Sequence, residues 1–136
     1  MIPKFLKNWF SKDENEDEVT LHLPKSEKVT FTLKIENVEV GTLRCENGVW
    51  EYAYAEEFKN DYHQDYKRIA GFPALDKIYK KETLWPFFLV RIPGLKQPAV
   101  KEIIEKENID TGNEVALLKR FGQRSISNPY ELVSSD

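Results

Sequence analysis

The residues whose types and spacing suggest catalysis are His63 and Cys45. His63 lies between Asp61 and Asp65, which resembles a general base with an orienting carboxylate. Side chains one or two positions apart do not face each other on a helix, so we interpret His63 as a surface histidine. Cys45 would need a basic neighbour and a cleft to act as a nucleophile. Its place in a predicted strand, opposite Trp50, favours a packing role.

A second group combines aromatic rings with a cation. Trp85, Phe87 and Phe88 lie close to Arg91 in the most apolar stretch of the chain, residues 84–93. Such a group is able to stack on bases or on the ring of a ligand. The alternative is that these rings fill the core, and the composition favours that alternative.

Sequence motifs for cofactors, metals and nucleophilic catalysis are missing. The chain has neither a Gly-x-Gly-x-x-Gly nor a Gly-x4-Gly-Lys-[Ser/Thr] phosphate loop, and it has no Gly-x-Ser-x-Gly or His-Glu-x-x-His motif. Its two histidines, His22 and His63, are too far apart in sequence for metal-ligand spacing. We therefore predict no catalytic residues, no cofactor and no metal, and a binding or regulatory module rather than an enzyme.

Composition sets the class of protein. The 136 residues suit one domain with a real core, because 40% of them are hydrophobic and 12% aromatic, which excludes disorder of the whole chain. A charged fraction of 32% argues against a membrane span. The net charge of -3 argues against a dominant role in binding nucleic acid. A single cysteine cannot form an internal disulfide, which favours a reducing, cytoplasmic location.

Residues 1–27 are predicted to be an N-terminal extension that precedes a domain of residues 28–133. The extension carries a short apolar helix with Trp9, an acidic linker over residues 13–18 and an edge strand over residues 19–23 that Pro24 ends. The apolar face of that helix has three possible contacts: the domain itself, a protein partner or a membrane surface. No signal peptide is predicted, because the continuous apolar core and the cleavage site are missing.

The domain begins with a predicted three-stranded meander over residues 28–54. Alternate residues from Val29 to Ile35 are apolar, which indicates a strand with one buried face. A two-residue turn, Glu36-Asn37, would then place three cross-strand pairs: Ile35 with Val38, Leu33 with Val40, and Lys34 with Glu39. The apolar phase slips by one residue at Gly41, which predicts a bulge that keeps Leu43 inside.

The second turn of the meander is the clearest in the chain. Asn47-Gly48 suits a type I′ hairpin turn, because both of its central residues need positive φ. This turn predicts three cross-strand pairs, which are Cys45 with Trp50, Leu43 with Tyr52, and Arg44 with Glu51.

The rest of the chain is expected to form short helices around the apolar stretch. Residues 55–68 suggest a short helix or a loop, residues 68–75 a strand or turn entering the core, and residues 76–83 a polar approach. Pro86 and Pro93 limit any helix between them to about two turns.

Two further helices are expected near the C-terminus. Pro98 begins a helix that reaches Asn108, and a second helix spans residues 113–121 with Asp110 or Thr111 as its cap. A last strand is placed through Ile126, and residues 134–136 are expected to fray. The predicted class is α+β, an antiparallel meander sheet with short helices packed on it.

The two helices over residues 98–121 have the spacing of a helix-turn-helix, and Lys119, Arg120 and Arg124 supply positive charge. This gives an alternative function, a small DNA-associated accessory protein. The acidic first helix and the overall charge count against it.

Several segments, taken in order, resemble the N-terminal domain of HipA-type serine/threonine kinases, the toxins of bacterial toxin–antitoxin systems. Each is similar to a family motif in turn: Val40-Gly-Thr-Leu43 with Trp50-Glu-Tyr-Ala-Tyr54, Ile69-Ala-Gly-Phe-Pro-Ala-Leu75, Phe87-Phe-Leu-Val-Arg-Ile-Pro93, and Glu114-Val-Ala-Leu-Leu118 with Gly122. The likeness covers about residues 29–125. Two departures are Arg91-Ile92 in place of Leu-Leu and the missing run of small residues after the last helix.

The resemblance implies an α+β fold of the HipA N-terminal type and a role in a toxin–antitoxin system. The kinase core of the family has no counterpart in this sequence, and stand-alone domains of this kind resemble HipS. HipS-like proteins bind a separate HipA- or HipT-like kinase and can act as its antitoxin, in systems that also contain a HipB-like DNA-binding protein. We expect a cytoplasmic, non-enzymatic regulator of such a kinase. Exposed aromatic and arginine side chains dominate binding energy, so the expected partner-binding residues are Trp85, Phe88, Arg91 and Trp9.

Overall fold

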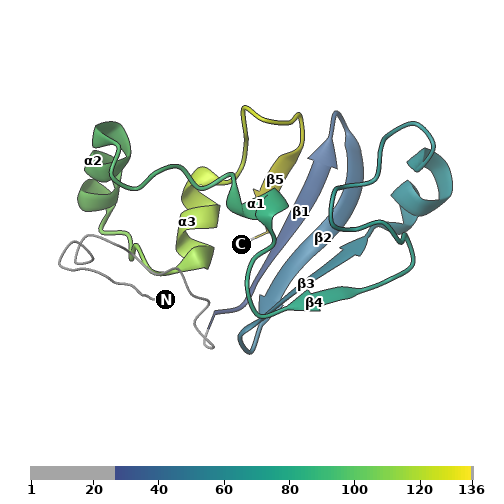
Figure 1. Ribbon diagram of the computed structural model, residues 1–136, viewed down its shortest axis with the longest axis horizontal. Helices are drawn as coiled ribbons and strands as arrows, with labels where there is room; N and C mark the ends of the chain where they lie inside the picture. The colour runs from purple at the N-terminus through teal and green to yellow at the C-terminus, as the bar shows by residue number, and fades with distance from the viewer. Residues whose placement is uncertain (1–26, 136) are drawn as a thin grey trace, which may run out of the picture.

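The computed structural model describes residues 27–135. Five antiparallel strands form one sheet in the order β4-β3-β2-β1-β5 (Figure 1). The strands are β1 (Val29–Ile35), β2 (Val38–Glu46), β3 (Val49–Tyr54), β4 (Tyr79–Lys81) and β5 (Glu131–Ser134). The helices are a π-helical turn η2 (Phe58–Tyr62), α1 (Pro86–Leu89), α2 (Pro98–Glu107) and α3 (Glu114–Phe121). The predicted α+β class with an antiparallel sheet is confirmed. The predicted short helix with Trp9, the predicted acidic linker and the predicted strand of residues 19–23 lie outside the described residues.

The meander follows the predicted turns closely. Asn47 has φ 56° and Gly48 φ 79°, as a type I′ turn requires, and the three predicted pairs across it form. Arg44 also makes a 3.5 Å ion pair with Glu51. The predicted bulge is present.

One predicted pair of the first hairpin is wrong. Leu33 pairs with Gly41 instead of Val40, while Lys34 pairs with Glu39 as expected. Val40 is therefore the extra residue of the bulge, and it turns inward beside Gly41, so that both are buried. The bulge thus lies one residue earlier than the apolar pattern suggested.

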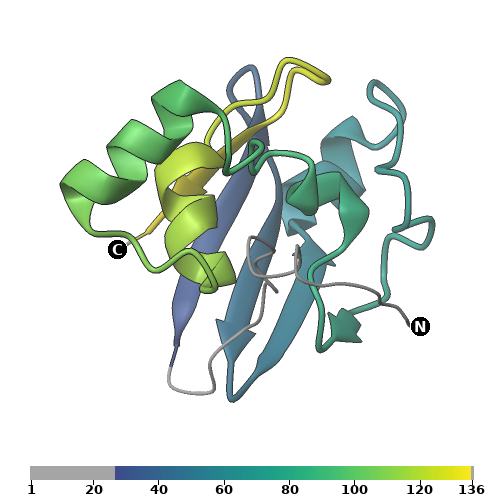
Figure 2. The ribbon, with the colours of Figure 1, turned by 60° about the vertical axis from the view of Figure 1, so that its left-hand side comes forward.

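The helices cover one face of the sheet. Figure 2 shows α1 and α3 on the same face, with α2 beyond α3 and farther from the strands. One turn of helix forms α1, within the predicted limit of two. Val115 and Leu118 of α3 belong to the main core, whereas Leu117 of α3 is fully buried outside that cluster. Because Leu117 points about 100° away from Leu118, α3 buries a second face as well.

Three predictions for the end of the chain need correction. The cap of α3 is Asn113, whose side-chain oxygen accepts from the N–H groups of Val115 and Ala116, and neither Asp110 nor Thr111 has that role. Ile126 is fully exposed in a loop, and the last strand is β5. Ser134 pairs with Phe31 and the N–H of Ser135 donates to Thr30, so these two residues extend the sheet and do not fray.

One strand was missed by the sequence analysis. Residues 79–81 form β4 at the edge of the sheet, where Lys80 pairs with Glu51 and Tyr79 with Tyr52. The segment is short and rich in lysine, so its sequence shows no alternation. Residues 68–75 form a turn that buries Ile69 and Phe72.

Candidate functional site

The apolar stretch of residues 84–93 crosses the helix-covered face of the sheet, and its rings join those of the hairpin. The ring of Tyr52 lies 4.5 Å from that of Phe72 and 5.8 Å from that of Phe88, measured between centroids. Trp85 packs edge-on against Phe72 at 5.0 Å. The aromatic hairpin therefore packs on the Phe87-Phe88 segment through Tyr52 and Phe88.

The proposed partner-binding residues differ in accessibility. Phe88 is fully buried and Arg91 is 4% exposed, whereas Trp85 is partly buried and keeps an accessible edge. Trp9 lies outside the described residues. Among the three described residues, only Trp85 is able to touch a partner without a rearrangement of the domain.

Arg91 forms the largest polar network in the described chain. Its Nη1 donates to the carbonyl oxygens of Gly122 at 3.0 Å and Gln123 at 3.3 Å. Its Nη2 donates to Asn128 Oδ1 at 3.0 Å and to the carbonyl oxygen of Tyr130 at 2.8 Å. All four acceptors lie in the connection between α3 and β5. Within the described residues, the Nε of Arg91 has no hydrogen-bond partner.

Within the described residues, the acceptors of this buried cation are three carbonyl oxygens and one amide oxygen, and none is a carboxylate. The carbonyl oxygens of Gly122 and Gln123 follow the last turn of α3, which carries the negative end of the helix dipole. We infer that this helix end stabilises the positive charge of the guanidinium. The ring of Phe87, with its centroid 5.7 Å from Arg91 Cζ, adds a cation–π contact. Burial lowers the pKa of Arg91 to about 10, so the group stays charged at neutral pH.

A buried carboxylate, Glu114, was not singled out as a site residue in the sequence analysis. Glu114 is 5% exposed at the start of α3, and its Oε1 accepts from Trp50 Nε1 at 3.0 Å. The position at the first turn of a helix stabilises negative charge. The bond joins residues 64 positions apart and fixes α3 to the hairpin. Nothing in the local sequence pattern reveals such a long-range pair.

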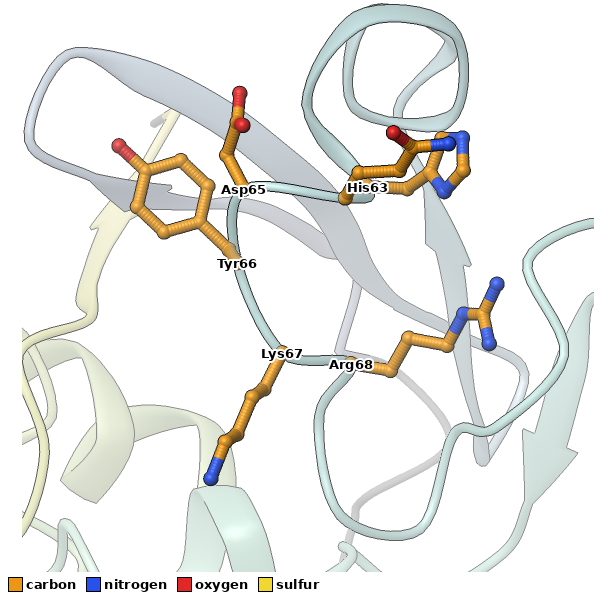
Figure 3. Close-up of a pocket in the computed structure, with 6 residues that line it drawn as sticks. His63, Asp65, Tyr66, Lys67 and Arg68 are labelled. Atoms are coloured by element: carbon orange, nitrogen blue, oxygen red, sulfur yellow. The ribbon is translucent and has the colours of Figure 1, made fainter.

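His63 and its neighbours line a shallow hollow formed by residues 63–68. Figure 3 shows that the side chains of this segment point in different directions, with Asp65 and Tyr66 on one side and Arg68 on another. Tyr66 donates to Glu36 Oε1 at 2.6 Å, which ties the segment to the first turn of the meander. These side chains do not converge on a common point, so the hollow has no arrangement for catalysis.

Metal binding and cysteine chemistry have little support in residues 27–135. No group of three or more His, Cys, Asp or Glu side chains in residues 27–135 is placed to hold a metal ion. Cys45 is 2% exposed in β2 across from Trp50.

None of the helices in residues 27–135 combines the length and the apolar character that a bilayer crossing requires.

The basic residues of the helical pair are partly engaged within the molecule. Arg120 of α3 makes a bidentate bond to Glu107 of α2, at 2.8 and 3.1 Å. Arg124 is paired with Glu131 at 3.3 Å. Less free positive charge is therefore left on this pair of helices than the sequence suggests.

No family model and no curated protein matches this chain.

Proposed function

We propose that this protein is a non-enzymatic binding partner and regulator of a separate HipA-type serine/threonine kinase, in the manner of a HipS-like antitoxin. What supports the proposal is that the segments that resemble the family pack as one unit. The ring of Tyr52 contacts those of Phe72 and Phe88, and Trp50 bonds to Glu114. The four segments are thus structurally coupled, as parts of one domain with the predicted HipA N-terminal-like fold would be.

A small domain inhibits a kinase only if it binds one kinase conformation more tightly than the others. Two physical routes are available to it: covering the nucleotide site or holding the two lobes of the kinase apart. The partly exposed edge of Trp85 is the contact that we propose first. Its ring is held by Phe72 and Phe88, so little side-chain entropy is lost on binding.

The first test is whether the genes beside this one encode a HipA-type kinase. The second is co-purification of such a kinase with this protein, followed by a phosphorylation assay with and without the protein. We expect a stable complex and lower kinase activity. Trp85→Ala should weaken the complex about tenfold while the far-ultraviolet circular dichroism stays unchanged. Absence of any complex with the wild-type protein would refute the proposed function. Unfolding of the variant would assign Trp85 to the core alone.

The alternative, a DNA-associated accessory protein acting through α2 and α3, makes a different prediction. Its affinity for DNA should fall steeply as the salt concentration rises. The same purified protein should be titrated with duplex DNA at low and high salt, and no binding at low salt would remove this alternative.

A further inference from the structure

The outward side of α1 is as apolar as its buried side. Trp85 and Leu89 are neighbours on that side, because the N–H of Leu89 donates to the carbonyl oxygen of Trp85 at 2.9 Å, and both are partly buried. Pro86 and Val90 form the next pair, joined by a 3.1 Å bond, and both are exposed. We call these four residues the α1 outer face.

The inner side of the same turn packs on the core. Phe88 is fully buried and contacts the rings of Trp85 and Phe87. A rotation of about 100° per residue places Phe88 and Arg91 opposite the α1 outer face. A helix that is apolar on every side is typical of a buried position. Val90 is nevertheless 60% exposed, so residues 27–135 leave part of this face uncovered.

Residues 1–26 join the domain on the side of the sheet that carries α1. Glu27 Oε2 accepts from Nδ2 of Asn113, the cap of α3, at 3.1 Å. Figure 2 shows α1 and α3 on the same face of the sheet. A chain as long as residues 11–26 spans about 50 Å when extended and about 20 Å as a flexible coil, whereas a domain of this size has a radius of gyration of about 13 Å. Residues 1–10 can therefore reach the α1 outer face.

The first ten residues carry an apolar group that suits this face. Phe5, Leu6, Trp9 and Phe10 recur at helical spacing, with Lys4 and Lys7 between them. Burial of such large side chains against Trp85 and Val90 removes apolar surface of both partners from water. The uncovered face and the apolar segment thus belong to the same chain.

Charge favours the same place. Residues 76–82, which lead toward α1, carry three lysines and two acidic residues, all of them exposed. Lys77 Nζ lies 5.0 Å from the centroid of the Tyr79 ring, and Tyr79 is connected to Trp85 through the ring of Phe72. The acidic run of residues 13–18 follows the apolar segment closely. A net positive surface beside the α1 outer face attracts that run.

We propose that residues 5–10 pack on the α1 outer face of their own chain and cover Trp85. A short flexible linker gives a tethered segment an effective concentration in about the millimolar range, so it occupies the face ahead of a second copy or a dissolved partner. This inference goes beyond the proposed function and does not depend on it. Its consequence is regulatory: a partner that contacts Trp85 must first displace residues 5–10.

The test attaches a nitroxide spin label to the full-length protein at Ser11→Cys, next to the apolar segment. Cys45 is 2% exposed, so the reagent modifies position 11. Paramagnetic broadening of amide signals is then compared between α1 and α2. Without docking, the label would visit exposed α2 residues such as Glu102 and Glu105 at least as often, because the chain enters beside α3. We expect broadening at Leu89 and Val90 to be about threefold or more greater than in α2.

Two matched double variants carry the same label. Leu6→Ser with Trp9→Ser removes apolar surface and should abolish the difference between α1 and α2. Lys4→Ser with Lys7→Ser changes the same number of residues in the same segment and should preserve it.

Three results would overturn the proposal. The first is equal broadening of α1 and α2 in the labelled wild-type background. The second is a difference that persists when Leu6 and Trp9 are both serine. The third is broadening of α1 in isotope-labelled protein mixed with a spin-labelled second copy, which would assign the contact to two molecules. No kinase is used, so failure of this intramolecular contact leaves the proposed function standing, and a protein that binds no kinase can still show the contact.

Discussion

The meander of residues 28–54 and the segment of residues 108–135 are stabilised in different ways. In the meander, neighbours in sequence decide the structure: two-residue turns set the pairing, and alternation sets the buried face. In the C-terminal segment, the decisive contacts come from far away. Glu114 is bonded to Trp50, and the connection between α3 and β5 is bonded to Arg91. Local rules therefore build the three strands of the meander, whereas two buried polar groups hold α3 and the connection that follows it.

The strongest test of this comparison is the removal of Arg91. Arg91→Met keeps an apolar stem but leaves four acceptors without their donor, so the free energy of unfolding should fall by about 3 kcal/mol or more. Amide hydrogen exchange should accelerate in residues 123–131 much more than in β2 and β3. Urea denaturation and exchange measured by mass spectrometry check both effects.

A lysine at the same position provides a control. Arg91→Lys keeps the charge but cannot reach four acceptors in a planar fork, so its stability should lie between those of the wild type and Arg91→Met. If Arg91→Met matches the wild type within about 0.5 kcal/mol and the exchange rates do not change, the long-range account of the C-terminal segment is wrong.

An intermediate effect is expected within the meander, at Gly41. A Cβ at this position would collide with the hydroxyl of Tyr52 and would lie 2.7 Å from the carbonyl oxygen of Ala53. The backbone carbonyl cannot move away cheaply, so Gly41→Ala should cost about 1 to 3 kcal/mol in urea denaturation. Gly94→Ala is the matched control, because its nearest atom is the flexible end of Gln97 at 3.2 Å.

Combining Gly41→Ala with Tyr52→Phe sharpens the result. The second substitution removes the hydroxyl but keeps the ring carbon Cζ, at 2.6 Å, and the carbonyl of Ala53, at 2.7 Å, so it should recover only part of the lost stability. Full recovery would mean that the hydroxyl of Tyr52 alone explains the need for glycine, and no loss in the single variant would remove the steric account altogether.

The smallest effect is expected for Tyr52→Phe alone. The hydroxyl of Tyr52 is buried and has no hydrogen-bond partner among residues 27–135, so its removal should leave stability at pH 7 unchanged or raise it by up to about 1 kcal/mol.

The effect of Tyr52→Phe on stability should be larger at alkaline pH than at pH 7. Burial raises the pKa of Tyr52 above its ordinary range, whereas the unfolded chain loses this proton near about pH 10. Stability therefore falls as the pH rises above that value, because the folded state keeps a proton that the unfolded state releases. Tyr52→Phe should make this alkaline loss shallower in thermal melts. Tyr54 and Tyr130, whose pKa values burial also raises, should preserve a part of it. Identical pH profiles for the variant and the wild type would contradict this account.

The sequence was informative wherever a structure depends on adjacent residues. Asn47-Gly48 predicted its turn and three cross-strand pairs, and Pro98 predicted the start of α2. The predicted strand through Ile126 is wrong, because a single apolar residue in a polar stretch shows no alternation that would indicate a strand. The dipeptide Asn128-Pro129 was a turn pattern that argues against a strand at that point. The burial of Arg91 and Glu114 could not have been predicted locally, because their partners lie 31 to 64 residues away.

The bond between Leu132 and Gln123 also affects how copies of this protein meet. It occupies an N–H on the outer side of β5, where a strand from another molecule would otherwise find a free donor. At the opposite edge of the sheet, β4 has only three residues, and two of them are Lys80 and Lys81. The two sheet edges therefore resist the addition of a foreign strand in different ways. The β5 edge has an occupied donor, and the β4 edge is short and positively charged. Both features should limit aggregation at high concentration.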